Sequence, residues 1–212
     1  MATQSDKRQH TMLATMARMQ EDHNRQVHPD WRTQGYAYYR AVWVECAELL
    51  DHYGWKWWKH QQPDLDQVKL ELVDIWHFGL SELLRGGRLD HNVVDQLVKA
   101  AQDQGGEAFR DAVERLAVNT LASKDFPVAD FAACMAALPM DYDELYRLYV
   151  GKNVLNHFRQ DHGYKQGTYR KSWHGREDNE HLIELLAELD VGSDEAPEKL
   201  YAGLAQRYAS AL

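Results

Sequence analysis

The spacing of the apolar residues restricts this chain to a helical fold more strongly than any other feature. Apolar residues recur at intervals of three and four through most of the 212 residues, which is the period of an α-helix. No alternating apolar and polar run, and no Asn-Gly or Asp-Gly pair, predicts a strand or hairpin. Glycine and proline divide the chain at helix-length intervals. We therefore expect helices over residues 5–26, 34–53, 64–84, 90–103, 108–122, 129–137, 142–160, 178–189 and 196–210.

These helices make the predicted fold class all-α, and the length fits a single domain over residues 1–212. Residues 90–140 could form a helical insertion within that domain. The Rossmann and phosphate-loop nucleotide sites are excluded, because their strands are not predicted and their glycine motifs are absent from the sequence.

The net charge of the chain argues against nucleic acids and anionic membranes as binding partners. The chain has 24 Lys and Arg against 33 Asp and Glu, a net charge of −9, whereas nucleic acids and anionic membranes attract basic surfaces. No apolar run has the length of a membrane span, and the N-terminus lacks the apolar stretch of a signal peptide. Cys46 and Cys134 are too few for a disulfide framework. We expect a cytoplasmic protein with no nucleic-acid and no membrane partner.

Two pairs of acidic residues lie inside strongly apolar segments. Glu45 and Glu48 stand in VWVECAELL, and Glu71 and Asp74 stand in KLELVDIWHF. The members of each pair are three residues apart and so share a helix face, where like charges repel and burial adds to the cost. A divalent cation would offset both effects, and hard oxygen ligands suit Mg²⁺. The alternative is a solvated acidic face, because a single E-x-x-E is common on exposed helices.

A connection of about a dozen residues separates the two acidic helices, so they can run antiparallel and turn their carboxylates toward each other. This arrangement predicts a helical bundle built around a four-helix metal-binding core with additional helices. Phe78 continues the stripe of Glu71 and Asp74, and it either stacks on a ligand or packs in the core. We expect His77 to be a hydrogen-bonded interior histidine rather than a metal ligand.

A basic segment over residues 152–176 interrupts the acidic chain. It holds six Lys and Arg against one acid, which gives +5. Lys152, Asn156 and Arg159 are spaced i, i+4, i+7 and share one helical stripe. Arginine binds phosphate oxygens bidentately and lysine binds them as a point charge. The segment therefore predicts phosphate binding, with a solvated basic surface and single-stranded nucleic-acid binding as alternatives.

Two further features suit a ligand site. Gly163 to Gly167 would end the basic helix and form a mobile closing loop, with Tyr164 in the loop and Lys171 after it. Trp55, Trp57 and Trp58 stand within four residues and cannot all point into one core. At least one of them is expected to line a pocket or an interface, although packing alone is the alternative.

These pieces, in this order, resemble the dimeric all-α dUTP pyrophosphatases (dUTPases), a group within the all-α nucleotide pyrophosphatases. The matching segments are ECAELLDHYGWKWWKH, KLELVDIWHF and YVGKNVLNHFRQDHGYKQGTYRKSWHGREDN. The acidic pairs match the metal signature of the wider superfamily, whereas the tryptophan run and the last segment are specific to the dUTPase branch. The resemblance covers roughly residues 10–86 and 141–190, and residues 87–140 carry no matching motif.

The resemblance implies a homodimer that hydrolyses dUTP, and dUDP as well, to dUMP. This reaction removes dUTP from the nucleotide pool and supplies dUMP for dTMP synthesis. It also implies a deoxyuridine nucleotide as substrate, Mg²⁺ as cofactor in more than one copy, and a role for each matching residue. The metal ligands would be Glu45, Glu48, Glu71 and Asp74; the phosphate contacts Lys152, Arg159, Tyr164, Lys171 and Asn179; and the nucleoside pocket Gln20, Asn24, Trp58, Phe78 and Asn156.

The expected mechanism is in-line attack of water on phosphorus. A carboxylate of the first pair, Glu48 with Glu45 as the second choice, would accept the proton of the water. Lysine and arginine would stabilise the developing charge. One alternative is an all-α nucleotide pyrophosphatase that acts on dCTP or on several nucleotides, and another is a metal-binding helical interaction protein that is not an enzyme.

Overall fold

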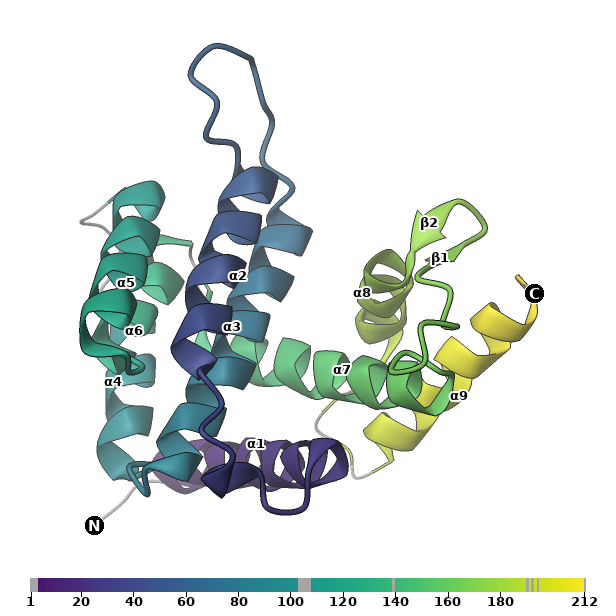
Figure 1. Ribbon diagram of the computed structural model, residues 1–212, viewed down its shortest axis with the longest axis horizontal. Coiled ribbons are helices and arrows are strands. Elements are labelled where there is room, and N and C mark those ends of the chain that lie inside the picture. The colour runs from purple at the N-terminus through teal and green to yellow at the C-terminus, as the bar shows by residue number, and fades with distance from the viewer. Residues whose placement is uncertain are drawn as a thin grey trace. The chain divides into compact units, whose positions relative to one another are not determined.

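A computed structural model describes residues 4–102, 108–138, 140–189, 191, 193 and 195–211, without the side chains of residues 100–102. Contacts between Cα atoms divide the chain into two compact units, residues 1–146 and 147–212, and each is described by itself. The described residues are overwhelmingly helical, which confirms the predicted all-α class (Figure 1). Within them, no helix combines the length and the apolar character needed to cross a membrane.

The first unit contains most of the helices. In order they are α1 (Gln4–Val27), the short 3₁₀ helix η1 (Trp31–Thr33), α2 (Tyr38–Tyr53), α3 (Leu65–Arg85), α4 (His91–Gln102), α5 (Phe109–Ser123), α6 (Val128–Ala137) and the start of α7 (Tyr142–Asp161). These bounds agree with the predicted helices to within a few residues; the predicted end at residue 103 lies outside the described residues.

Helices α2 and α3 form an antiparallel hairpin at the centre of this unit (Figure 1). They pack against each other more extensively than any other pair of elements. Helix α3 is buried along most of its length, with Val68, Leu72, Ile75 and Trp76 fully enclosed. Helices α4, α5 and α6 cover one side of the hairpin, and α1 crosses one of its ends. The hairpin is therefore the packed centre of the unit.

The start of α2 differs from the prediction. The apolar pattern predicts a helix from residue 34, but α2 begins at Tyr38. Gly35 has φ +67°, in the left-handed region, so the chain turns there before the helix can start.

The second unit consists of the rest of α7, a two-residue antiparallel strand pair, α8 (Asp178–Glu188) and α9 (Ala196–Ala209). The strands β1 (Ser172–Trp173) and β2 (Arg176–Glu177) pair directly, and no strand was expected here. Their turn is His174-Gly175, both with positive φ, as in a two-residue hairpin loop. Phe158, Trp173 and Tyr208 form edge-to-face contacts in the core of this unit.

Candidate active site

Three of the four predicted metal ligands lie together on the α2–α3 hairpin. One carboxylate oxygen each of Glu45, Glu71 and Asp74 lies within 4.8 Å of the others. Glu45 comes from α2, and the other two come from successive turns of α3. Glu71 is buried, and His52 Nε2 lies 3.8 Å from its Oε1. We call Glu45, Glu71 and Asp74 the carboxylate cluster.

Burial and mutual repulsion change the acidity of this cluster. Removal from water, and then the charges of Asp74 and Glu71, raise the pKa of Glu45 to about 9. A carboxylic acid with that pKa holds its proton at neutral pH, so the cluster cannot carry its full negative charge by itself. The donors are all carboxylate oxygens, the set that Mg²⁺ prefers. The cluster therefore fits a divalent cation, whose charge would offset the mutual repulsion of the carboxylates.

Glu48, the fourth predicted ligand, is placed differently. Its side chain is exposed on α2, and the group of close carboxylate oxygens found among the described residues does not include it. It still contributes to the raised pKa of Glu45, as the weakest of the causes. Glu48 thus lies at the solvent side of the carboxylate cluster.

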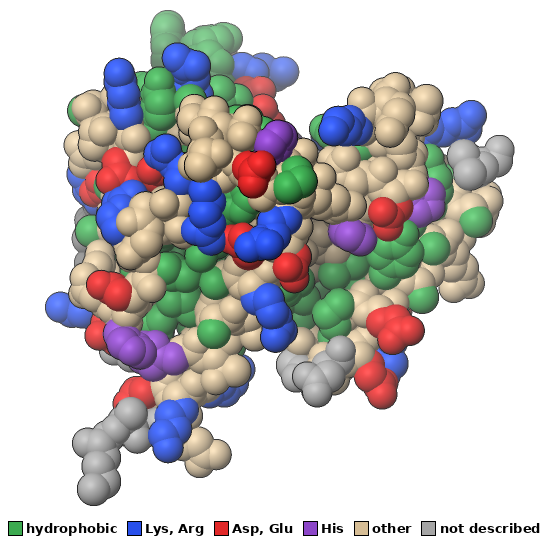
Figure 2. Space-filling view, turned by 60° about the horizontal axis from the view of Figure 1, so that its bottom comes forward, with side chains coloured by type: hydrophobic (Ala, Val, Ile, Leu, Met, Phe, Trp, Pro, Cys, Tyr) green, Lys and Arg blue, Asp and Glu red, His purple; other side chains and the backbone are tan. Residues whose placement is uncertain are grey.

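The tryptophans lie on the loop that joins α2 to α3. Trp57 is 90% exposed and Trp58 57% exposed, and their rings meet edge to face, with centroids 5.4 Å apart. Figure 2 shows hydrophobic side chains with Lys and Arg beside them at this end of the unit. These indoles are therefore available to a ligand or partner rather than used in the core.

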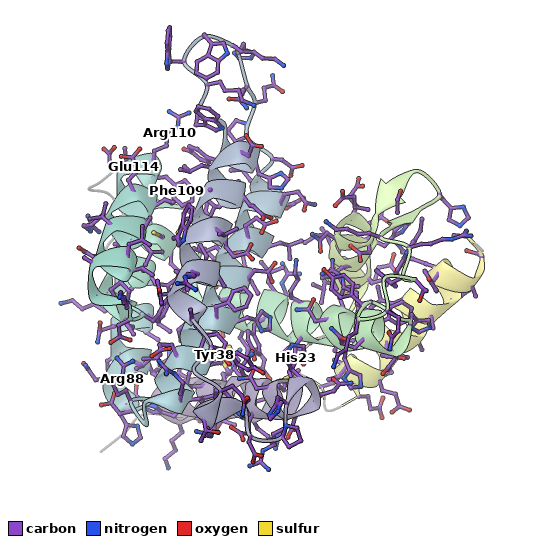
Figure 3. The ribbon with its side chains drawn as sticks, in the orientation of Figure 1. His23, Tyr38, Arg88, Phe109, Arg110 and Glu114 are labelled. Atoms are coloured by element: carbon purple, nitrogen blue, oxygen red, sulfur yellow. The ribbon has the colours of Figure 1, made fainter. Side chains whose placement is uncertain are left out.

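This loop is held in place at its base. The Oε1 of Gln61 accepts hydrogen bonds from the backbone N–H groups of Trp55 (3.1 Å) and Lys56 (2.8 Å). Arg110, on α5, donates from Nε to the carbonyl oxygen of Gly54 at 2.8 Å; Figure 3 shows it at the end of α5 nearest the loop. The region with no matching motif, residues 87–140, thus contributes a residue that supports the tryptophan loop.

Gln20 and Asn24, the predicted base-reading pair on α1, share a buried network with α3. Gln20 Nε2 donates to Asn24 Oδ1 (3.1 Å) and to Ser81 Oγ (3.0 Å), and Asn24 Nδ2 donates to Ser81 Oγ (3.0 Å). His77 Nδ1 lies 2.7 Å from Gln20 Oε1, so His77 is the hydrogen-bonded interior histidine that was expected. We call Gln20, Asn24, His77 and Ser81 the amide cluster. Phe78, next to His77, is half-buried.

Tyr38, at the start of α2, lies beside the amide cluster. Burial raises its pKa to about 12, and the influence of Ser81 opposes this shift. Figure 3 shows Tyr38 at the end of the hairpin that α1 crosses. The phenol therefore stays neutral at physiological pH.

In the second unit, the predicted phosphate-binding residues of α7 meet the start of α8. Lys152 Nζ donates to Asn179 Oδ1 at 3.1 Å, and Arg159 Nη1 donates to Asn156 Oδ1 at 3.1 Å. Arg159 also binds Asp178 bidentately, with both distances 2.8 Å. These five residues form the basic cluster: Lys152, Asn156, Arg159, Asp178 and Asn179.

Tyr164 and Lys171 lie nearer the surface of the second unit. The Tyr164 side chain is 53% exposed. Lys171 Nζ lies 3.2 Å from Glu177 Oε2, and both side chains are more than half exposed. Both residues can therefore be reached by a ligand without any displacement of the core.

Sequence reasoning missed two residues that organise these groups. Asp178 is fully buried and accepts a hydrogen bond from the Tyr169 hydroxyl group at 2.8 Å as well as the two from Arg159. Ser81 is the common acceptor of the amide cluster. The only signal for Ser81 was its place on α3, seven residues after Asp74 and so on the same stripe; the signal for Asp178 was its place beside Asn179 in the matched segment.

A family model described as dUTPase matches residues 12–164 of the chain. The match includes the carboxylate cluster, Glu48, the tryptophan loop and the amide cluster, and it ends after Tyr164. A search of the curated proteins found no match.

Proposed function

Because the chain belongs to the all-α dUTPase family and hydrolyses dUTP, we propose that Mg²⁺ bound at the carboxylate cluster is required for this reaction. The single observation that supports the proposal is the convergence of Glu45, Glu71 and Asp74 within 4.8 Å. The raised pKa of Glu45 reflects the same convergence, because the charges of Asp74 and Glu71 contribute to it after burial. We propose more than one ion, with Glu48 as the additional ligand.

The proposed roles of the acidic residues follow from their placement. Mg²⁺, when bound, would neutralise phosphate charge and lower the pKa of water. Glu48 has solvent access and adjoins the carboxylate cluster, so we assign it as the general base that takes the proton of the attacking water. Glu45 is the second choice for this role. Glu71 and Asp74, on the largely buried α3, would keep the ligand oxygens in place.

The proposed phosphate contacts come from the second unit. Arg159 and Lys152 are cations whose positions are set by Asp178 and Asn179, so they would offer preorganised donors to phosphate oxygens. Tyr164 and Lys171 are exposed and complete the assigned set together with Asn179. These donors would stabilise the charge that develops as the bond to the leaving phosphate breaks.

The proposed nucleoside pocket is built from aromatic and amide side chains. Trp58 has an exposed ring and Phe78 a half-exposed one, and either can stack on a pyrimidine or exclude the methyl group of thymine. Amide groups offer both a donor and an acceptor to the edge of uracil, and we assign Gln20, Asn24 and Asn156 to this pocket.

We further propose that dUDP is also a substrate, that the enzyme limits the dUTP pool and supplies dUMP for dTMP synthesis, and that it works as a cytoplasmic homodimer. Cys46 and Cys134 are both free and buried, as suits a reducing compartment. The molecular mass in solution at micromolar concentration checks the oligomeric state, and a monomeric mass would contradict the dimer.

A nucleotide panel tests the proposal. Purified protein is incubated with dUTP, dUDP, dCTP, dTTP and UTP, with Mg²⁺ or with EDTA, and the products are resolved by chromatography. We expect dUMP from dUTP and dUDP in Mg²⁺ only. Turnover of dUTP in EDTA would contradict the metal requirement, and equal turnover of dCTP would favour a broader nucleotide pyrophosphatase. Metal binding without any turnover would favour the interaction protein.

A further inference from the structure

We infer that His77 and Ser81 fix the orientation of the Asn24 amide and thereby make the enzyme prefer uracil to cytosine. The inference rests on the proposed assignment of Gln20 and Asn24 to the nucleoside pocket. It assigns to Gln20 a positioning role rather than direct reading of the base.

The amide cluster is a buried polar network, so its hydrogen bonds must be mutually compatible. Gln20, Asn24, His77 and Ser81 are 3%, 6%, 6% and 1% exposed, and a buried polar group that loses its partner is costly. A side-chain amide has one end that donates and one that accepts. Each amide must therefore adopt the one orientation that suits its neighbours.

Ser81 determines that orientation. Its hydroxyl group donates to the backbone carbonyl oxygen of His77 at 2.9 Å, whereas the other acceptor, Asn24 Oδ1, is at 3.4 Å. A hydroxyl group has one hydrogen, so Ser81 Oγ faces both amides as an acceptor. Gln20 and Asn24 must then both turn their NH₂ groups toward Ser81.

His77 fixes the other end of Gln20. With its NH₂ group toward Ser81, Gln20 presents Oε1 to His77 Nδ1, and the distance of 2.7 Å requires a hydrogen on that nitrogen. Both hydrogens of Gln20 Nε2 are donated, one to Asn24 and one to Ser81. Gln20 therefore has no donor left for a base, and its contribution is to hold Asn24.

Asn24 is the member of the cluster that can read a base. One Nδ2 hydrogen goes to Ser81 and its Oδ1 accepts from Gln20, which leaves the second Nδ2 hydrogen with a fixed direction. Uracil presents a carbonyl oxygen at position 4, as thymine does, whereas cytosine presents an amino group there. A fixed N–H donor can form a hydrogen bond with the carbonyl oxygen of uracil, but it faces another donor in the amino group of cytosine. The same contact therefore favours uracil and rejects cytosine.

The position of the cluster along α3 suits this role. His77 and Ser81 follow Asp74 by three and seven residues, which is about 4.5 Å and about 10.5 Å along the helix axis. All three lie on one stripe. A nucleotide whose phosphates lie at the carboxylate cluster would thus extend its base along α3 toward the amide cluster.

The test is the ratio of kcat/KM for dUTP to that for dCTP in Mg²⁺. Ser81→Ala removes the shared acceptor, and His77→Leu removes the donor to Gln20. We expect each substitution to lower the ratio about tenfold or more, because the side-chain amide groups can then rotate and exchange their donor and acceptor ends. His77→Asn is the matched control, since its amide nitrogen can replace Nδ1, and it should keep the ratio within about threefold of the wild type.

The ratio separates specificity from general damage. A loss of folding or of phosphate binding lowers both rates together and leaves the ratio unchanged. If the wild type is active and Ser81→Ala leaves the ratio unchanged, this inference is overturned while the proposed function stands. A wild type that does not hydrolyse dUTP would overturn the proposed function first. If the His77→Leu protein melts below the assay temperature, the result for Ser81→Ala decides the test, because that substitution removes only one oxygen atom.

Discussion

The carboxylate cluster and the basic cluster differ in how their charges are balanced. One carboxylate oxygen each of Glu45, Glu71 and Asp74 lies within 4.8 Å of the others, and burial together with the charges of Asp74 and Glu71 raises the pKa of Glu45 to about 9. In the basic cluster, by contrast, Arg159 is held bidentately by the buried Asp178. In the first cluster like charges converge, and a bound cation would relieve their repulsion, whereas in the second the arginine already has a buried carboxylate as its partner.

The two clusters should respond differently to pH and to the metal ion. A group that must change its ionisation when the cofactor binds is sensitive to pH and to metal, whereas a group held by a buried partner keeps its geometry in both states. We therefore expect variants of the two clusters to fail in different ways. Changes near the carboxylate cluster should affect turnover, and changes in the basic cluster should affect substrate binding.

The largest expected effect is that of Glu48→Gln. If Glu48 is the general base, kcat should fall by at least about a hundredfold, the lower end for a lost general base. The fold should be unaffected, because the side chain is exposed and lies outside the close group of carboxylate oxygens. Steady-state hydrolysis of dUTP measures the loss. Glu114→Gln is the matched control, since Glu114 is an exposed acid on α5 (Figure 3). Turnover near that of the control would transfer the role of base to Glu45.

A smaller effect is expected for Arg159→Lys. Lysine keeps the charge opposite Asp178 but loses the fork that binds two oxygens, so the affinities for dUTP and dUDP should both fall about tenfold. Alanine would be a poor choice here, because it would leave a fully buried carboxylate without its cation. Calorimetry with dUDP and a non-hydrolysable dUTP analogue measures the affinities. Unchanged affinities would mean that Arg159 serves only to hold Asp178.

Much of the fold could be predicted because its determinants are local. The helical period and the glycines at Gly54 and Gly86 mark the ends of α2 and α3, and i, i+3 spacing places Glu71 and Asp74 on one stripe. The hairpin then brings Glu45 to them. The hairpin at His174 escaped prediction because a positive φ at a histidine is set by the strands around it and is uncommon outside such turns.

The rest of the site depends on contacts that no local spacing contains. Asp178 pairs with Arg159 across 19 residues and an intervening strand pair, so neither residue alone indicates the other. Ser81 looks like an unremarkable helix residue until α1 is placed against α3. Whether Glu48 would join the other carboxylates depends on the rotation of α2, which a three-residue spacing leaves open. These features require the packed structure.

The smallest expected effect concerns stability rather than activity. Because the pKa of Glu45 is about 9 in the folded state and near 4.5 ordinarily, the folded state binds this proton more tightly between those values. The free energy of unfolding of the metal-free protein should therefore fall as pH rises from about 4.5 to about 9. In EDTA we expect Tm to drop by a few degrees more in the wild type than in Glu45→Gln between pH 6 and pH 9. Mg²⁺ should reduce this drop in the wild type, because the cation replaces the proton as the balancing charge. Parallel Tm curves for the two proteins in EDTA would show that Glu45 ionises normally, and the contrast between the two clusters would then be lost.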